Sequence, residues 1–449
     1  MRIVGRVTLM ALVVAGSMGV AAGSAVRAQD PREVTFAFWG DPAEEDAYTE
    51  VIDTFSETVP GIEVDASYTP GQGDYQTKIS TDFASGNPPD VFLINYRRFG
   101  QYAARGALEP LGPRLRASET LREEEFYPIV LDAFRYRGEE LTCIPQNVSS
   151  LVVYFNQALF EAAGVPLPAP GWTWDDFVAA AKALTVDQDG DGETDQHGLG
   201  VEPSMIRYAP FIWAAGGEIV DNPDNPTKLT IDTPEAIAGI QWFMDLGIQN
   251  HNVVPMEAEV LAEDDESRFM NGTTAMLLQS RRVVPTLREI DDFTWDVAPL
   301  PVGPAGQVGI LHSDAFCMAA EAEDKEAAWA FIEYAVGPQG QKILAETGRT
   351  VPSLRSVAES PAFLGADLLP GVEAPGAAPA SSEVFLETIP QIRRVPSIST
   401  WPEVEEAFNT AFQRAFYEEI DLEGAIDVAQ NRSEEAFRRA SEEELVEQG

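Results

Sequence analysis

The sequence contains few cysteines, few histidines and few positive charges. Its 449 residues include 2 Cys and 3 His, and 73 Asp and Glu against 30 Lys and Arg give a formal net charge of -43. This charge repels phosphate backbones, which excludes nucleic acid as a partner. The HExxH, GxSxG and phosphate-loop motifs are absent, so the metalloprotease, serine-hydrolase and nucleotide chemistries lack their residues. Apolar residues make up 45%, which is typical of a folded chain.

Long apolar runs are also absent. The apolar stretch over residues 9–20 is shorter than the roughly 20 residues that a membrane-spanning helix requires. Arg2 and Arg6 precede this stretch, and small residues flank Arg27 after it. The pattern predicts a signal peptide over residues 1–28, cleaved near Ala28. We therefore expect a soluble protein exported to a bacterial periplasm, without a transmembrane helix.

The two cysteines, Cys143 and Cys317, allow two interpretations. In an oxidising compartment they can form a disulfide if the fold brings their Cα atoms within about 7 Å. Otherwise they are two small buried apolar side chains. The sequence alone leaves both interpretations open.

Strand and helix patterns alternate near the start of the mature chain. Residues 34–39, 62–68 and 90–94 have strand patterns, and residues 44–59 and 75–84 have helical spacing between them. This alternation predicts an α/β fold with a mostly parallel, doubly wound sheet. Ligands bind such sheets at the carboxyl ends of the strands, which makes residues 39–41 and 95–98 candidate site loops.

The alternation continues to the end of the chain, whose length requires at least two cores. A surface excursion is expected at 365–382, and Thr173 is placed as a helix cap. The other expected elements are strands within 151–155, 273–278 and 307–319, and helices over 158–163, 174–184, 234–248, 325–334, 402–418 and 434–447.

Five stretches, in this order and spacing, resemble the extracellular solute-binding proteins of carbohydrate ABC importers, the family typified by maltose-binding protein. They span nearly all of the mature chain: Asp90 to Leu111, Ile144 to Val165, Trp213 to Asp221, Phe269 to Met276 and Asp324 to Val336.

The resemblance implies a periplasmic binding protein-like fold, in which two doubly wound α/β lobes are joined by crossing hinge strands and a ligand cleft lies between them. The crossings are expected near 145–150, 296–307 and 348–354. The N-terminal lobe would then comprise 29–144 plus 307–347, and the C-terminal lobe 145–306 plus 348–449. A monomer would capture a small carbohydrate by lobe closure and deliver it, chemically unchanged, to the transmembrane subunits of an ABC permease.

A sugar has apolar ring faces and a rim of hydroxyl groups, so a binder needs aromatic planes and hydrogen-bonding side chains. Trp39, Trp213 and Trp401 could supply the planes, although an aromatic residue is more often part of the core. At several of the matched positions, including Ser149 and Arg282, this chain has a different residue type from the maltose binder. The predicted ligand-binding residues are Trp39, Asp41, Asn95, Arg97, Arg98, Asn147, Ser149, Tyr208, Trp213, Arg281, Arg282, His312, Arg349 and Trp401.

Arginines are prominent among these positions, namely Arg97, Arg98, Arg281, Arg282 and Arg349. Guanidinium groups bind carboxylate or phosphate in bidentate fashion, so one alternative is an anionic ligand such as a uronate, sugar phosphate or glycerophosphodiester. The other is that these arginines pair with the abundant acids. A secreted glycosidase, which needs only two suitably separated carboxylates, is a third and more remote function.

An acidic stretch, DQDGDG, begins at Asp187. Its carboxylates alternate and Gly192 occupies the sixth position, a spacing typical of calcium loops. Gly198 stands at the twelfth position, where such loops carry a glutamate. The sequence therefore predicts a structural calcium site, with a solvated acidic turn as the alternative and no other cofactor required. Its expected ligands are Asp187, Asp189, Asp191, Glu193 and Asp195.

Overall fold

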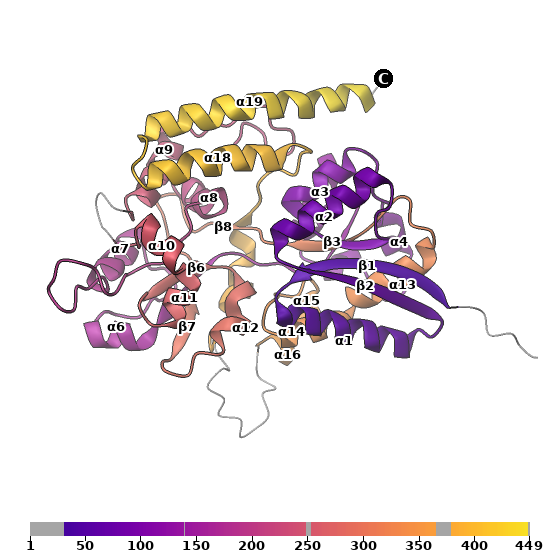
Figure 1. Cartoon of the computed structure of the whole chain (residues 1–449), viewed down its shortest axis with the longest axis horizontal. Helices are drawn as coiled ribbons and strands as arrows, with labels where there is room; N and C mark the ends of the chain where they lie inside the picture. Colours follow the sequence, from indigo (N-terminus) through magenta and orange to yellow (C-terminus); the bar gives the residue numbers. More distant parts are fainter. Residues whose placement is uncertain (1–30, 139, 248–252, 365–378, 448–449) are drawn as a thin grey trace, which may run out of the picture.

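Two α/β lobes lie side by side along the long axis of the molecule (Figure 1). The computed structural model describes residues 31–138, 140–247, 253–364 and 379–447. The expected signal peptide and most of the expected surface excursion lie outside the described residues. Among the described helices none is both long and apolar enough to cross a membrane.

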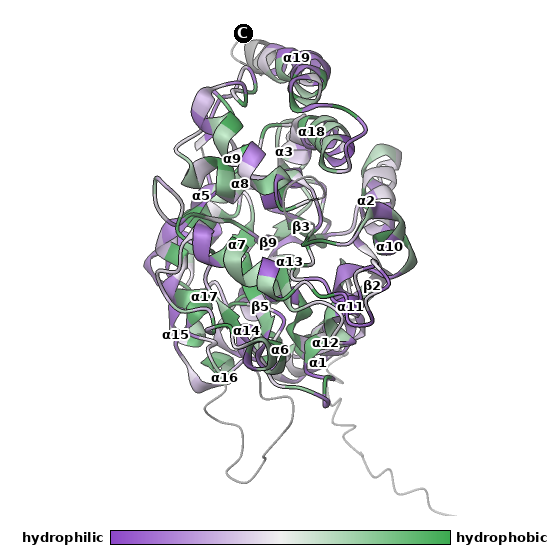
Figure 2. Ribbon diagram, turned by 90° about the vertical axis from the view of Figure 1, so that its left-hand side faces the viewer, coloured by the Kyte–Doolittle hydropathy of each residue, from purple (hydrophilic) through white to green (hydrophobic). Residues whose placement is uncertain are grey.

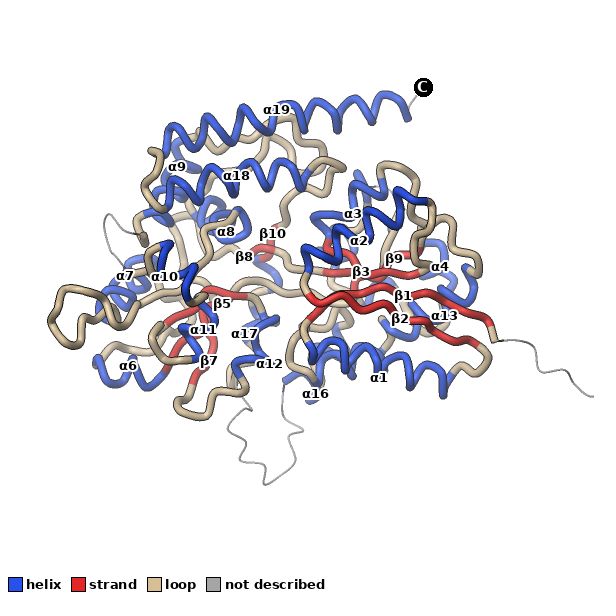
Figure 3. The backbone as a smooth tube through the Cα atoms, viewed as in Figure 1, coloured by secondary structure: helices blue, strands red, loops and turns tan. Residues whose placement is uncertain are grey.

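The first lobe is built on a five-stranded sheet with the order β2-β1-β3-β9-β4. β1 pairs in parallel with β2 and β3, as the alternating pattern predicted, whereas β9 runs antiparallel to β3 and β4. Figure 3 shows the strands of this sheet with α1 on one side and α2 on the other. The strands are β1 (Arg32–Gly40), β2 (Ile62–Pro70), β3 (Val91–Asn95), β4 (Ile144–Pro145) and β9 (Asp314–Met318).

Side-chain caps start two of the first-lobe helices at the carboxyl ends of strands. Asp41 follows β1 and its Oδ1 accepts the Glu44 amide at 3.0 Å, and Asn95 ends β3 and its Oδ1 accepts the Arg97 amide at 3.2 Å. The helices of this lobe are α1 (Pro42–Thr58), α2 (Gln72–Ser85), α3 (Tyr96–Ala103), α4 (Gly112–Ala117), α5 (Pro128–Ala133), α13 (Lys325–Ala335) and α14 (Pro338–Glu346).

The second lobe contains a three-stranded sheet with the order β6-β5-β7. Both strand pairs are antiparallel, which differs from the mostly parallel sheet that the sequence predicted. A single helical crossover makes neighbouring strands parallel, but more than a hundred residues separate β5 from its neighbours, so that constraint does not apply. The strands are β5 (Val152–Asn156), β6 (Met276–Gln279) and β7 (Trp295–Ala298).

Helices surround this smaller sheet. The Thr173 cap is confirmed, since its Oγ1 accepts the Asp176 amide and the Asp176 carboxylate accepts the Thr173 amide. The helices are α6 (Gln157–Ala163), α7 (Trp174–Ala183), α8 (Met205–Ala214), α9 (Pro234–Met244), α10 (Glu257–Ala262), α11 (Asp265–Met270), α12 (Val284–Leu287), α17 (Val384–Glu387), α18 (Trp401–Phe416) and α19 (Leu422–Glu447). Figure 2, which views the molecule from the second-lobe side, shows mostly hydrophobic residues in the ribbon at α7.

Three segments carry the chain between the lobes. The Val148 amide donates to the Val351 carbonyl at 2.8 Å, and the Ser149 amide donates to the His312 carbonyl at 2.9 Å. Two of these crossings lie within the expected ranges 145–150 and 348–354. The expected crossing at 296–307 is wrong, because β7 is still held in the second sheet by β5. The chain crosses instead after β8 (Gly309–Ile310), which pairs with β10 (Ile392–Arg393).

Two further details differ from the expected division. α15 (Arg355–Ala358) and α16 (Pro361–Leu364) pack on α14, so the stretch after residue 348 first follows a first-lobe helix rather than the second lobe. The last helix begins at Leu422, twelve residues before the expected start, and lies along α18 (Figure 1).

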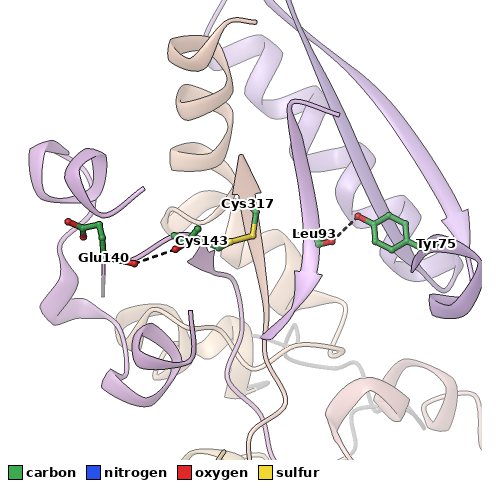
Figure 4. The surroundings of a disulfide bond; sticks show 6 residues. Tyr75, Leu93, Glu140, Cys143 and Cys317 are labelled. Carbon is green, nitrogen blue, oxygen red and sulfur yellow. Dashed lines mark hydrogen bonds between the residues drawn. A yellow bond between two sulfur atoms is a disulfide. The ribbon is translucent and has the colours of Figure 1, made fainter. Parts of the chain in front are cut away.

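Cys143 and Cys317 form a disulfide, with their Cα atoms 4.5 Å apart (Figure 4). Cys143 immediately precedes β4 and Cys317 lies in the neighbouring strand β9. Both residues are fully buried. Of the two interpretations, the structure therefore supports the disulfide. The bond joins two cysteines that are 174 residues apart in sequence.

Reduction of this disulfide is expected to lower the free energy of unfolding by about 2–4 kcal/mol, because the bond restricts a long loop of the unfolded chain. Urea denaturation with and without dithiothreitol measures the difference. The double variant Cys143→Ser, Cys317→Ser is the control, and its midpoint should not respond to dithiothreitol. Two reactive thiols in the unfolded but unreduced protein would contradict the assignment.

Candidate functional site

A cavity of about 1030 Å³ lies between the two lobes. The first lobe contributes the ends of β1 and β3 with the starts of α1 and α3, and the second lobe contributes residues of α8, β6 and α18. The loops at 39–41 and 95–98, expected as site loops, therefore line it. Ten of the fourteen predicted ligand-binding residues line this cavity: Trp39, Asp41, Asn95, Arg97, Arg98, Asn147, Ser149, Arg282, His312 and Arg349.

The other three predicted aromatic residues lie in the core of the second lobe rather than at the cavity. Trp401 is fully buried at the start of α18, and Trp213 is 4% exposed beneath the guanidinium of Arg393. Tyr208 is fully buried, and its ring packs against Phe243 at 4.3 Å between centroids. None of these three side chains lines the cavity, which differs from the prediction that they contact the ligand.

Arg281 is also absent from the cavity lining. It is 1% exposed, and its Nε donates to the Gly348 carbonyl at 2.8 Å. Its guanidinium lies 4.2 Å from the ring centroid of Phe363 and 4.7 Å from that of Phe385. Arg281 therefore joins the second lobe to the segments that follow α14.

Trp39 is the one predicted tryptophan that lines the cavity. It is half-buried at the end of β1, and its ring centroid lies 4.8 Å from that of Tyr75. The Tyr75 hydroxyl donates to the backbone carbonyl of Leu93, as Figure 4 shows, which fixes Tyr75 against β3. Trp39 is thus a supported aromatic side chain at the cavity wall.

A buried ion pair connects the lobes across the cavity. Arg97, in α3 of the first lobe, donates through Nη1 to Glu405 Oε1, in α18 of the second. Both side chains are about one-tenth exposed. The attraction of Glu405 raises the pKa of Arg97 in spite of burial.

Arg349 makes a second connection between the lobes. It forms ion pairs with Asp41 and with Glu44, whose Oε2 lies 2.7 Å from Arg349 Nε, and it also donates to the Arg282 carbonyl at 3.0 Å. Burial raises the pKa of Glu44 to about 7, even against the attraction of Arg349. Arg282 is itself paired with Glu266. Three of the predicted arginines are therefore matched by acids.

Asp314 is a cavity residue that sequence reasoning missed. It starts β9, its carboxylate accepts from Asn95 Nδ2 at 3.0 Å, and Asn147 Oδ1 accepts the Asp314 amide at 2.7 Å. Burial raises the pKa of Asp314. These three residues form a polar wall on the first lobe.

Glu405, Ser204 and Arg207 also line the cavity without having been predicted. Arg207 offered a signal in the sequence, because it is the only charged residue in the helical stretch MIRYAPFIWA. Several buried atoms at the cavity have no hydrogen-bond partner among the described residues: Ser204 Oγ, Arg207 Nε and Nη1, His312 Nδ1 and Glu405 Oε2.

The acidic loop lies apart from the cavity. Single carboxylate oxygens of Asp187, Asp189 and Asp195 lie within 4.8 Å of one another. Asp187 also accepts the amides of Gly190 and Gly192 at 2.7 and 3.0 Å, which folds the loop around it.

The other two predicted calcium ligands, Asp191 and Glu193, do not belong to this group. Asp191 Oδ1 instead accepts the Glu193 amide at 2.8 Å.

Comparison with known proteins agrees with this architecture. A family model for bacterial extracellular solute-binding proteins matches residues 39–342. A protein of Brucella abortus named as a binding protein is 25% identical over 377 residues, which is 82% of this chain and 84% of that protein. The erythritol/L-threitol-binding protein of Mycolicibacterium smegmatis is 24% identical over 330 residues, or 67% of this chain and 66% of that protein.

The solved structures show the same fold. An ABC substrate-binding protein from Listeria monocytogenes, in complex with cycloalternan, is similar over 92% of this chain and 100% of its own, with a TM-score of 0.79 and 24% identity. Two α/β lobes with a polar cavity between them define a periplasmic binding protein-like fold. The chain belongs to the bacterial extracellular solute-binding protein family, as the resemblance in its motifs predicted.

Replacement of Glu405 by alanine is expected to lower the free energy of unfolding by about 3 kcal/mol, because Arg97 would remain buried without its counter-charge. Urea denaturation of the variant measures this. Glu403→Ala is the matched control, since Glu403 lies in the same helix and pairs with Arg439 at the surface, where a pair contributes about 0–1 kcal/mol. Equal effects of both substitutions would contradict the importance of the buried pair.

Proposed function

We propose that the protein captures a sugar or related polyol in the interlobe cavity, closes its lobes around the ligand and delivers it to the transmembrane subunits of an ABC importer. The protein acts as a monomer and leaves the ligand chemically unchanged. Signal-peptide cleavage near Ala28 places it in the periplasm. The mass of the protein recovered from the periplasm would test that cleavage site.

The observation that carries this proposal is the mixture of unmatched donors and acceptors at the cavity. Arg207 offers N–H donors, Glu405 Oε2 is an acceptor, and the Ser204 hydroxyl can be either. A buried polar group without a partner costs about 1–3 kcal/mol. A hydroxyl group both donates and accepts, so a polyhydroxylated ligand satisfies such a set, while Trp39 presents a plane to its apolar face.

The names of the relatives support the same ligand class. The Mycolicibacterium protein is named for erythritol and L-threitol, and the Listeria structure contains cycloalternan. These relatives are named as binding proteins, which favours capture over catalysis. Incubation with oligosaccharides distinguishes the two, since a glycosidase would release shorter products and a binding protein would not.

Lobe closure has a physical basis in the contacts that already connect the two lobes. The Arg97–Glu405 pair and the Arg349 contact to the Arg282 carbonyl both form only when the cavity walls are close together. A ligand that contacts both walls adds to these interactions and therefore favours the closed arrangement.

A bound ligand is expected to raise the melting temperature and to reduce the radius of gyration. A thermal-shift screen over sugars and polyols identifies the ligand by mass action, and small-angle scattering with and without it measures closure. An unchanged radius of gyration with a tightly bound ligand would contradict the closure mechanism.

Trp39→Leu is expected to weaken binding about tenfold, because it removes the aromatic plane at the cavity. Isothermal titration measures the affinity. Trp242→Leu is the matched control, since Trp242 stacks on Trp174 at 4.3 Å between centroids and does not line the cavity. The control should lower stability and leave affinity unchanged. Equal losses of affinity would remove Trp39 from the site.

We also propose that the loop at Asp187, Asp189 and Asp195 binds a structural calcium ion. The alternate carboxylates and the close approach of their oxygens support it. Calcium is expected to raise the melting temperature relative to chelator-treated protein, and Asp189→Asn should abolish that rise. Asp292→Asn, at an exposed acid outside the loop, is the control. A melting temperature of the wild type that does not respond to calcium would favour the solvated acidic turn.

A further inference from the structure

Arg207 is a buried guanidinium at the cavity that the protein leaves partly unsatisfied. It is 3% exposed and lines the cavity from α8. Its Nη2 donates to Gln279 Oε1 at 2.9 Å, while its Nε and Nη1 have no hydrogen-bond partner among the described residues. The Nε–H and Nη1–H groups lie on different edges of the guanidinium, so Arg207 has two separate buried donors without partners among the described residues.

Among the described residues, Arg207 makes only one long ion pair. Its nearest carboxylate, Glu202, lies 3.9 Å from Nη2, and the Glu202 side chain is 68% exposed to water. Burial lowers the pKa of Arg207 to about 10, which shows that this environment disfavours the charge. A buried charge without a counter-charge is costly, so this arrangement is unusual for a structural arginine.

The other cavity arginines are in a different situation. Arg97, Arg282 and Arg349 are each paired with an acid, as described above. Arg98 has no ion pair among the described residues, but its side chain is only partly buried and water can reach it. Among the cavity arginines, Arg207 is therefore the one that is buried without a close counter-charge and has donors without a hydrogen-bond partner among the described residues.

We propose that Arg207 binds an acidic group of the ligand, so that the ligand is a polyhydroxylated molecule bearing one carboxylate or phosphate ester. This inference rests on the proposed function and narrows its ligand class. An oxygen of a carboxylate or phosphate accepts a charge-assisted hydrogen bond from a guanidinium N–H group, which is stronger than a bond from a neutral donor. The Ser204 hydroxyl, one turn earlier at the start of α8 and also unpartnered, provides a further donor on the same wall.

The charges of the opposite wall give the ligand an orientation. On the first lobe, Asp314 with Asn95 and Asn147 forms a wall that accepts and donates hydrogen bonds but would repel an anion. Asp41 of the first lobe is already bound by Arg349. The acidic group of the ligand therefore lies against α8 in the second lobe, and its hydroxyl groups face the first lobe.

The test compares neutral compounds with their acidic twins. Isothermal titration uses galactose with galacturonate, glucose with glucuronate, erythritol with erythronate, and glycerol with glycerol 3-phosphate. The acidic twin of at least one pair is expected to bind about tenfold or more tightly than the neutral one. The carboxylate and phosphate arms distinguish the two sources of the acidic group.

The variant Arg207→Gln should remove the preference for the acidic twin, and Arg207→Lys, which keeps the charge but has only one donor nitrogen, should reduce it. Arg394→Gln is the matched control, because Arg394 is paired with Asp224 in the same lobe and does not line the cavity. It should keep the full preference. Circular dichroism and the melting temperature of each variant establish that it is folded.

Three results would overturn the inference. Neutral compounds that bind as tightly as their acidic twins would refute the role of Arg207 and leave the proposed function standing. A preference that survives Arg207→Gln in folded protein would place the acidic group elsewhere. Failure of every compound to bind would count against both the inference and the proposed function.

Discussion

Backbone hydrogen bonds between three crossing segments hold two separately packed lobes in one molecule. The segments pair through Val148 with Val351 and Ser149 with His312. The side chains of Ser149 and His312 also line the cavity. The hinge and the base of the site are therefore made of the same residues. The proposed closure would be a rotation about these segments that changes the separation of the walls.

The cavity is lined by several charged side chains, and burying a charge has a large desolvation cost. Most of its arginines are neutralised by acids of the same or the opposite lobe, as Arg97 is by Glu405. Such pairs position the walls but offer little to a ligand, because their strongest hydrogen-bonding capacity is already used. The groups that remain unmatched, above all Arg207, are therefore the ones that bear on ligand chemistry. In the proposed function, this difference between paired and unpaired arginines would let a chain with a net charge of -43 present a positive group to its ligand.

Much of the first lobe could be predicted from the sequence, because its elements follow one another as β1, α1, β2, α2 and β3, and these three strands lie side by side in the sheet in the order β2-β1-β3. The candidate site was predictable for the same reason where it lies at strand ends: Asp41 and Asn95 each follow a strand and cap the next helix. The second sheet was not predictable in this way, since β5 pairs only with strands that come more than a hundred residues later.

The sequence by itself determined the α/β class, the order of the early elements, the Thr173 cap and the family resemblance, because each can be recognised from patterns within short stretches of the chain. Only the tertiary structure decided which side chains face the cavity. Trp401 and Tyr208 are residue types that can stack on a sugar ring, but they are fully buried and do not line the cavity. Arg207, in contrast, lies in an apolar helix and does line the cavity. The tertiary structure also decided that Cys143 and Cys317 form a disulfide. Orientation and pairing depend on contacts between segments far apart in sequence, and no local pattern encodes them.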